Sequence, residues 1–210
     1  MKKFLLSVAA LAMTLTMSAA GEDCISATGW VDNFTADSLP GKAPLSMVYW
    51  GEPTVYTQTR SGNGSLDLSV TQALNGWTPM GFDLGETTTY VDISGNLSIS
   101  TSITNSGPAG IEVYFSFISG RTTGASAKSV SGDASGNPFG GVIGAGATKV
   151  FTFDLTGAKK RVWKADAASC TAVGGTLLAG TNSCMIDLGF NPAELSTGEF
   201  SINGAGASVN

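Results

Sequence analysis

The sequence predicts an all-β protein, an antiparallel β-sandwich or barrel, and three observations support this fold class. Large apolar residues alternate with small polar ones over short stretches, which is the period of a strand with one buried face. Glycine, proline, asparagine and serine separate these stretches and mark turns. No stretch beyond the first twenty residues shows a convincing apolar stripe of helical period, so virtually no helix is expected there.

The clearest strands lie in the middle of the chain. Residues 97–104 alternate for much of their length, and residues 111–117 do the same after the turn signal Asn105-Ser106-Gly107-Pro108. Other strands are expected at 29–34, 46–58, 65–71, 77–84, 149–155, 185–190 and 199–202. The segment 121–147 is rich in Gly, Ser and Ala and is predicted to be a long flexible loop, either functional or an insertion of no consequence.

The first twenty residues have the features of a secretory signal peptide. Lys2 and Lys3 precede an apolar stretch that is too short to cross a bilayer, and Ser18-Ala19-Ala20 supplies small residues for cleavage. The mature chain is then one domain, 21–210, with a net charge of 9 − 16 = −7. We expect a secreted, periplasmic or cell-surface protein of bacterial type, with no lipid anchor and no membrane insertion.

The composition argues against several classes of function. The chain has no histidine, which excludes Ser-His-Asp triads, Cys-His pairs and imidazole-based zinc sites. The formal charge is −5, and the one short run of cations, Lys159-Lys160-Arg161, is interpreted as a solvated turn, so nucleic-acid binding is not expected. No nucleophile elbow, phosphate loop or dinucleotide fingerprint occurs, and sequence cannot give the separation of a carboxylate pair, so we predict that the protein is not an enzyme.

Three cysteines in an oxidising compartment leave one unpaired. Cys170 and Cys184 are close in sequence and enclose a glycine-rich stretch, which predicts a disulfide that brackets an exposed hairpin or loop. Closing such a loop stabilises the fold by roughly 3 kcal/mol in the chain-entropy model. Cys24 is then a free thiol, an alternative partner of one of the other two, or the link of a disulfide-bonded homo-oligomer.

The order of motifs resembles the galactose-binding-like jelly-roll carbohydrate-binding modules over nearly the whole mature chain. The motifs are Trp30-Val31-Asp32-Asn33-Phe34, residues 62–68 before Trp77, residues 91–99, residues 149–155, Val162-Trp163, residues 186–192 and residues 198–203. The resemblance implies a jelly-roll β-sandwich and non-catalytic recognition of a polysaccharide or cell-surface glycan.

The resemblance also implies a structural calcium ion between the opening and closing strands. The acidic positions of such modules are occupied here by Thr35 and Asn203, and neutral ligands weaken a calcium site. Asp32, Asp37 and Asn203 are therefore candidate ligands of a weak site; alternatively, the aspartates only cap turns.

A sugar-binding face needs aromatic rings for the apolar side of a pyranose and polar groups for its rim. The candidate stacking residues are Tyr49, Trp50, Tyr56, Tyr114 and Trp163, and the candidate orienting residues are Gln58, Arg60 and Glu112. Tyr114 is favoured because alternation places it on the opposite sheet face from Phe115 and Phe117. Any single ring could instead fill the core, as is expected for Trp30 and Trp77.

A second class of function stays open. Carbohydrate-binding modules usually accompany a hydrolase in the same chain, and a module that stands alone is unusual. The alternative is a structural or adhesive protein of an extracellular assembly, a filament or matrix subunit. If the protein binds carbohydrate, the low charge of the predicted face implies that the affinity depends only weakly on salt concentration.

Overall fold

The computed structural model describes the chain in full over residues 90–120 and 127–203, apart from the side chains of residues 200 and 203. Of the earlier part it describes the backbone of seven strands. These are β1 (Lys2–Ser7), β2 (Met17–Ser18), β3 (Cys24–Ser26), β4 (Met47–Tyr49), β5 (Tyr56–Ser61), β6 (Ser65–Val70) and β7 (Trp77–Asp83).

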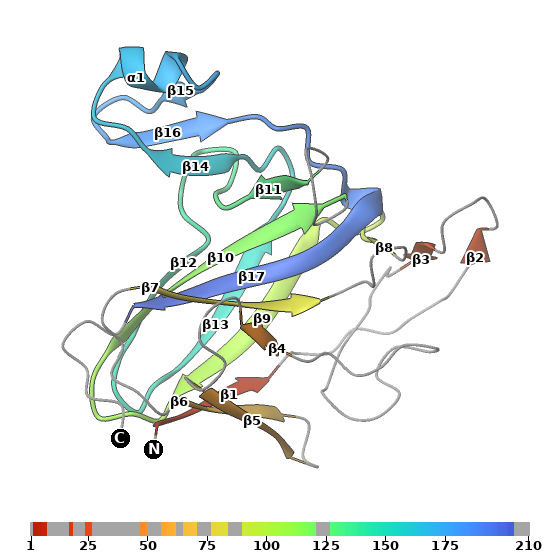
Figure 1. Cartoon of the computed structure of the whole chain (residues 1–210), viewed down its shortest axis with the longest axis vertical. Helices are drawn as coiled ribbons and strands as arrows, with labels where there is room; N and C mark the ends of the chain where they lie inside the picture. Colours follow the sequence, from red (N-terminus) through yellow and green to blue (C-terminus); the bar gives the residue numbers. More distant parts are fainter. Residues whose placement is uncertain are drawn as a thin grey trace.

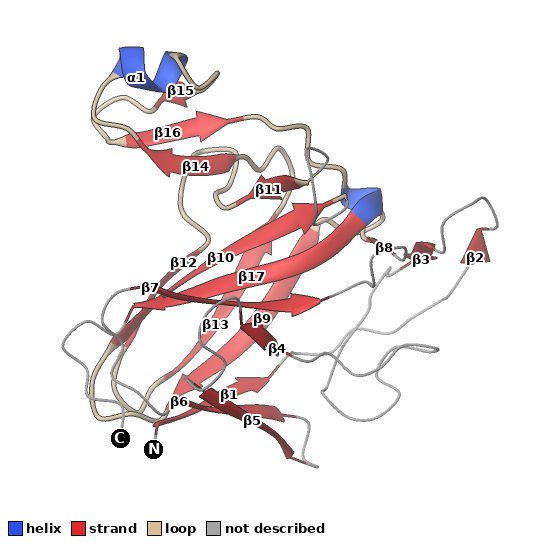
Figure 2. Cartoon of the chain, viewed as in Figure 1, coloured by secondary structure: helices blue, strands red, loops and turns tan. Residues whose placement is uncertain are grey.

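The remaining elements follow in an almost unbroken series of strands (Figure 2). They are β8 (Tyr90–Asp92), β9 (Ser98–Asn105), β10 (Ile111–Ser119), β11 (Lys128–Val130), β12 (Gly140–Ile143), β13 (Thr148–Asp154), β14 (Lys160–Trp163), α1 (Ala167–Thr171), β15 (Thr176–Leu177), β16 (Ser183–Ile186), the 3-10 turn η1 (Pro192–Glu194) and β17 (Leu195–Asn203). The predicted all-β class is confirmed. Helix in the described residues is limited to α1 and η1.

The strands form three sheets (Figure 1). One has the order β13-β9-β1-β6-β5, and a larger one follows β11-β10-β17-β8-β3-β2, with β12 beside β10 and with β7 and β4 beside β17. A small third sheet, β14-β16-β15, lies at one end of the molecule. Pairing is antiparallel throughout these sheets except between β3 and β8.

The two large sheets share one core of phenylalanine rings. Phe115 and Phe117 come from β10, and Phe151 and Phe153 come from β13 in the opposite sheet. The ring centroids of Phe115 and Phe153 are 4.7 Å apart, and those of Phe117 and Phe153 are 5.3 Å apart. Phe139 closes the group at 5.3 Å from Phe153. The inner face of each strand is therefore set by alternation, and packing of the two faces excludes water from one continuous cluster.

The structure differs from the sequence prediction in several described regions. The single strand expected at 46–58 is replaced by parts of β4 and β5, which belong to different sheets. The segment 121–147 is not a plain loop, because it contains β11 and β12, and both strands pair with β10. The strand expected at 185–190 is instead Ser183–Ile186, and the following residues to 190 are outside any strand.

The predicted signal peptide overlaps a strand of the structure. β1 pairs with β6 on one side and with β9 on the other. Removal of residues 1–20 would therefore take away the neighbour that β6 and β9 share. Separately, no helix among the described residues has the length and apolar character needed to span a bilayer.

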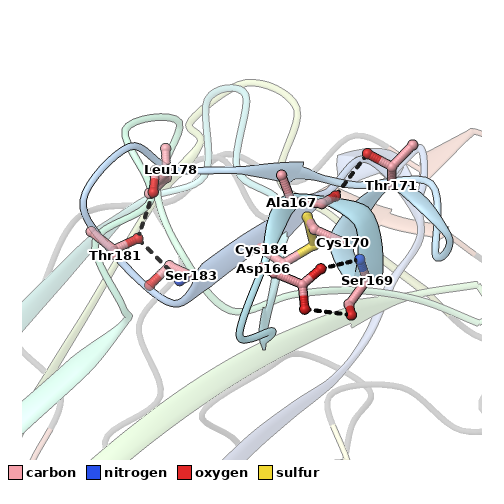
Figure 3. The surroundings of a disulfide bond; sticks show 9 residues. All are labelled: Asp166, Ala167, Ser169, Cys170, Thr171, Leu178, Thr181, Ser183 and Cys184. Carbon is pink, nitrogen blue, oxygen red and sulfur yellow. Dashed lines mark hydrogen bonds between the residues drawn. A yellow bond between two sulfur atoms is a disulfide. The ribbon is translucent and has the colours of Figure 1, made fainter.

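The predicted Cys170–Cys184 disulfide is confirmed, with the two Cα atoms 5.6 Å apart. It joins α1 to β16, so the bracketed segment is a short helix followed by a hairpin (Figure 3). Asp166 caps α1 by accepting hydrogen bonds from the amide and the hydroxyl of Ser169, at 2.8 and 2.9 Å. A Cβ at Gly175 would lie 3.0 Å from the sulfur of Cys170 and still closer to that of Cys184, which explains part of the glycine content between the cysteines.

Candidate functional site

The outward face of β10 is a strip of half-buried polar residues. Glu112, Tyr114 and Ser116 alternate along the strand with the buried residues Val113 and Phe115. Tyr114 thus lies on the sheet side opposite the phenylalanine core, as the alternation predicts.

Two hydrogen bonds order the side chains of this strip. The Tyr114 hydroxyl donates to Glu112 Oε1 at 2.9 Å, and Ser116 Oγ donates to Glu199 Oε2 of the neighbouring strand β17 at 2.9 Å. The pKa of Tyr114 is raised, first by burial and then by its hydrogen bond to Glu112 and the charge of that residue. The phenol is therefore a neutral ring at physiological pH, and it is held at its hydroxyl end.

The register extends the strip across the sheet. Glu112 is opposite Asn203 of β17, and Asn203 is opposite Trp77 of β7. Residues opposite one another in an antiparallel ladder belong to the same sheet side. The backbone of residue 77, whose side chain was expected in the core, thus lies in the same row as Glu112.

Gly140 of β12 lies beside Tyr114 in the register. Its φ of 152° is unfavourable for residues with a side chain, and a Cβ there would overlap the backbone of Val113 and come within 2.8 Å of the Tyr114 Cα. Only glycine fits this close approach. As a result, the position next to the Tyr114 ring carries no side chain.

Arg161 lies on β14 of the small sheet, so the sequence interpretation of residues 159–161 as a solvated turn is wrong for it. Its amide donates to Ser131 Oγ at 2.9 Å, and its Nε donates to the hydroxyl of Ser183 at 3.0 Å. Its charge acts on Tyr114, where it opposes the rise of the phenol pKa. The alternation of Lys159, Arg161 and Trp163 was the signal in the sequence that could have identified it.

Trp163 is the most exposed large apolar side chain of the described residues, with 71% of its surface accessible. It lies two residues beyond Arg161 and therefore on the same side of β14. Its register partner is Ser183, the residue whose hydroxyl binds Arg161. In the next pair of the register Val162 is opposite Cys184, and Cys184 is linked by the disulfide to Cys170 of α1.

The structure joins two of the predicted sugar-binding residues, Glu112 and Tyr114, by a hydrogen bond. Trp163 lies on β14 of the small sheet, two residues from Arg161, whose charge acts on Tyr114. Tyr56, Gln58 and Arg60 all lie on β5, at the edge of the other large sheet. Tyr49 ends β4, and the register row of its backbone runs through residues 80 and 200 to Phe115.

The calcium prediction falls mostly outside the described residues. Asp32, Asp37 and Trp50 are not among them, and Asn203 is described only by its backbone in β17. Over 90–120 and 127–203, no three acidic or cysteine side chains gather closely enough to hold a metal ion.

The strip carries two acidic residues. Glu199 is opposite Ser116, which is four residues along β10 from Glu112. At about 3.4 Å per residue this places the two backbone positions roughly 14 Å apart along the strand. Each carboxylate accepts a hydrogen bond from a hydroxyl of the strip.

Comparison with known proteins gives no match: no protein-family model, no curated protein and no solved structure is significantly similar to this chain.

Proposed function

We propose that this protein is a secreted, non-catalytic carbohydrate-binding protein with a jelly-roll sandwich fold. It recognises a β-linked polysaccharide on the outward face of β10 and β17. The observation that carries the proposal is the half-buried Tyr114 ring, held by Glu112 on the side of the sheet that faces away from the phenylalanine core.

The chemistry of the face suits a sugar polymer. A pyranose presents apolar C–H groups to an aromatic ring and hydroxyl groups to polar side chains. Tyr114 and Trp163 supply the rings, while Glu112, Ser116 and Glu199 supply acceptors and donors that are already held in place. Affinity is expected to be modest, because an open face leaves much of a flexible ligand hydrated.

Binding to a panel of soluble and insoluble polysaccharides tests the proposal. Tyr114→Ala and Trp163→Ala should each weaken binding, while both variants keep the thermal stability of a folded domain. Val150→Ser is the matched control, because Val150 is a 61% exposed apolar residue on β13, in the other sheet. Loss of stability with unchanged affinity in the tyrosine variant would mean that the ring is structural.

The same experiment examines the alternative, an extracellular assembly subunit. If no polysaccharide is bound and the protein elutes as an oligomer in size-exclusion chromatography, an assembly role through Cys24 or the protein surface is the better account. The mass of the exported protein tests the signal peptide, since cleavage is expected before Gly21.

A further inference from the structure

Positive charge is concentrated around the small third sheet. After the predicted leader the chain has nine cations against sixteen acids. Five of these cations lie on or beside β14 and its neighbour β11: Lys128, Lys159, Lys160, Arg161 and Lys164. Three acidic residues, Asp133, Asp166 and Asp187, lie in the same region, so cations exceed acids there by 5 − 3 = 2. This local excess, in a protein that is acidic as a whole, attracts anions.

Arg161 is the member of this group that is held in place. Ser131 and Ser183 fix its backbone amide and its Nε. Within the described part of the chain, its two terminal nitrogens have no acceptor. A guanidinium fixed in this way presents parallel N–H groups, and a carboxylate is the partner that matches this fork.

A row of hydrogen bonds connects Arg161 with the strip on β10. The Arg161 amide binds Ser131, the Ser131 carbonyl accepts from the amide of Phe139 at 3.0 Å, and the Phe139 carbonyl accepts from that of Phe115 at 2.7 Å. These bonds, and the effect of the Arg161 charge on Tyr114, place β14 near the strip. A ligand chain with one end on Trp163 and Arg161 is therefore expected to extend toward Tyr114.

Glu112 places a negative charge at the Tyr114 end of this path. An anionic group on a ligand would be repelled there and attracted at Arg161. Positions 161 and 163 are about 7 Å apart along the strand, which is close to the span of one sugar ring with a carboxylate on its edge.

We propose that the site selects acidic polysaccharides, with the carboxylate of a uronic acid bound by the Arg161 guanidinium and the ring of that sugar stacked on Trp163. This inference rests on the proposed function and names its substrate class. Because Arg161 was not among the residues predicted for the face, weak salt dependence of the affinity was expected. With Arg161 in the site, the affinity for an acidic ligand should instead fall as the salt concentration rises.

The test compares a soluble glucuronoxylan, a β-linked polymer whose uronic acids are isolated side groups, with a neutral soluble β-glucan by affinity electrophoresis and calorimetry. Arg161→Gln should weaken glucuronoxylan binding about tenfold or more, the size expected for a charge-assisted hydrogen-bonded pair, and leave β-glucan binding nearly unchanged. Arg161→Lys should give an intermediate loss, and Trp163→Ala should weaken both ligands. Lys149→Gln is the charge-matched control, because Lys149 lies on β13 and contacts Val142 and Phe151 there.

Several outcomes would overturn the inference. An equal loss in Lys149→Gln would show non-specific attraction, and a glucuronoxylan affinity that is unchanged between 0.05 and 0.5 M salt would show that charge is not used. Binding of the β-glucan without the glucuronoxylan would overturn this inference and leave the proposed function intact. If neither polymer binds but vesicles of anionic phospholipid do, both proposals fail. Thermal unfolding of each variant checks that Arg161 variants remain folded despite the lost bond to Ser183.

Discussion

Asn105 is completely buried at the end of β9, where it joins two turns that lie beside the candidate site. Its side-chain nitrogen donates to the carbonyl oxygens of Ala109, Gly144 and Ile143, at 2.8, 3.1 and 3.3 Å. Its side-chain oxygen accepts from the amide of Gly107 at 3.0 Å. These bonds fix the loop that leads into β10 and the turn between β12 and β13.

Asn105→Asp keeps the shape of the side chain and replaces its hydrogen-bond donor, the NH2 group, with an acceptor oxygen. The two N–H donors disappear, and a carboxylate oxygen faces three carbonyl oxygens instead. Two lost hydrogen bonds cost about 1 kcal/mol each, and the orphaned acceptors and buried charge add to this. We expect a loss of at least about 3 kcal/mol at neutral pH, which corresponds to a fall in Tm of roughly 6 to 12 °C for a domain of this size.

The variant should also be sensitive to pH. Burial and the facing carbonyls raise the pKa of the new carboxyl group in the folded state above its value of about 3.9 in the unfolded chain. A group with a raised folded pKa contributes most below the unfolded pKa, and its contribution falls as pH rises through the window between the two values. The deficit relative to wild type should therefore shrink toward pH 4, where a protonated carboxyl can donate one hydrogen bond.

Urea unfolding at pH 7 and pH 4 measures both effects. Asn96→Asp is the matched control, because Asn96 is exposed and uses only its oxygen, which accepts from the Ser98 amide at 3.2 Å. A carboxylate can accept the same bond, so this variant should stay within about 0.5 kcal/mol of wild type. Equal unfolding midpoints for Asn105→Asp and wild type at pH 7 would refute the role assigned to Asn105.

Three further predictions follow from the described residues. The Thr101 hydroxyl is buried without a hydrogen-bond partner, so Thr101→Val should raise the free energy of unfolding by about 1 kcal/mol. The control Thr104→Val removes a 2.7 Å hydrogen bond to Thr148 and should not stabilise the protein. Equal effects of the two variants in urea unfolding would contradict this prediction. Gly140→Ala should lower Tm and polysaccharide affinity together, because an added Cβ overlaps the backbone of β10; an unchanged Tm would rule out this close approach. The pKa of Asp166 is lowered by the hydrogen bonds that it accepts from Ser169. The α1 cap should therefore persist at neutral pH and be lost only as pH falls below the ordinary carboxyl pKa. An NMR signal of the Ser169 amide that titrates at or above that pKa would argue against the cap.

The sequence by itself determined the features that depend on neighbouring residues. Alternation over residues 97–104 and 111–117 predicted two strands, and it also predicted which sheet side Tyr114 occupies, because successive side chains in a strand must point to opposite sides. The short separation of Cys170 and Cys184, the glycine-rich stretch between them and the expected export together predicted their disulfide.

The sequence failed where a strand exists only because a neighbour is present. β11 and β12 are short, and β12 begins with two glycines, so their own propensity for strand is low. They form because β10 offers hydrogen-bonding groups along its edge, and because Gly140 permits an approach that no side chain would. Local composition alone therefore indicated a flexible loop.

The assembly of the site was decided by tertiary structure. Alternation fixes the side of a sheet on which a residue lies, but not the strand that pairs with it. Pairing placed Gln58 and Arg60 in the other sheet. The fold also brought Arg161 near enough for its charge to act on Tyr114, which is 47 positions earlier in the chain. Likewise, the sequence predicts only that Asn105 belongs to a turn. The fold brings its side chain to the carbonyl oxygens of residues 143 and 144. These contacts depend on how the two large sheets pack around their phenylalanine core, which is a property of the whole chain.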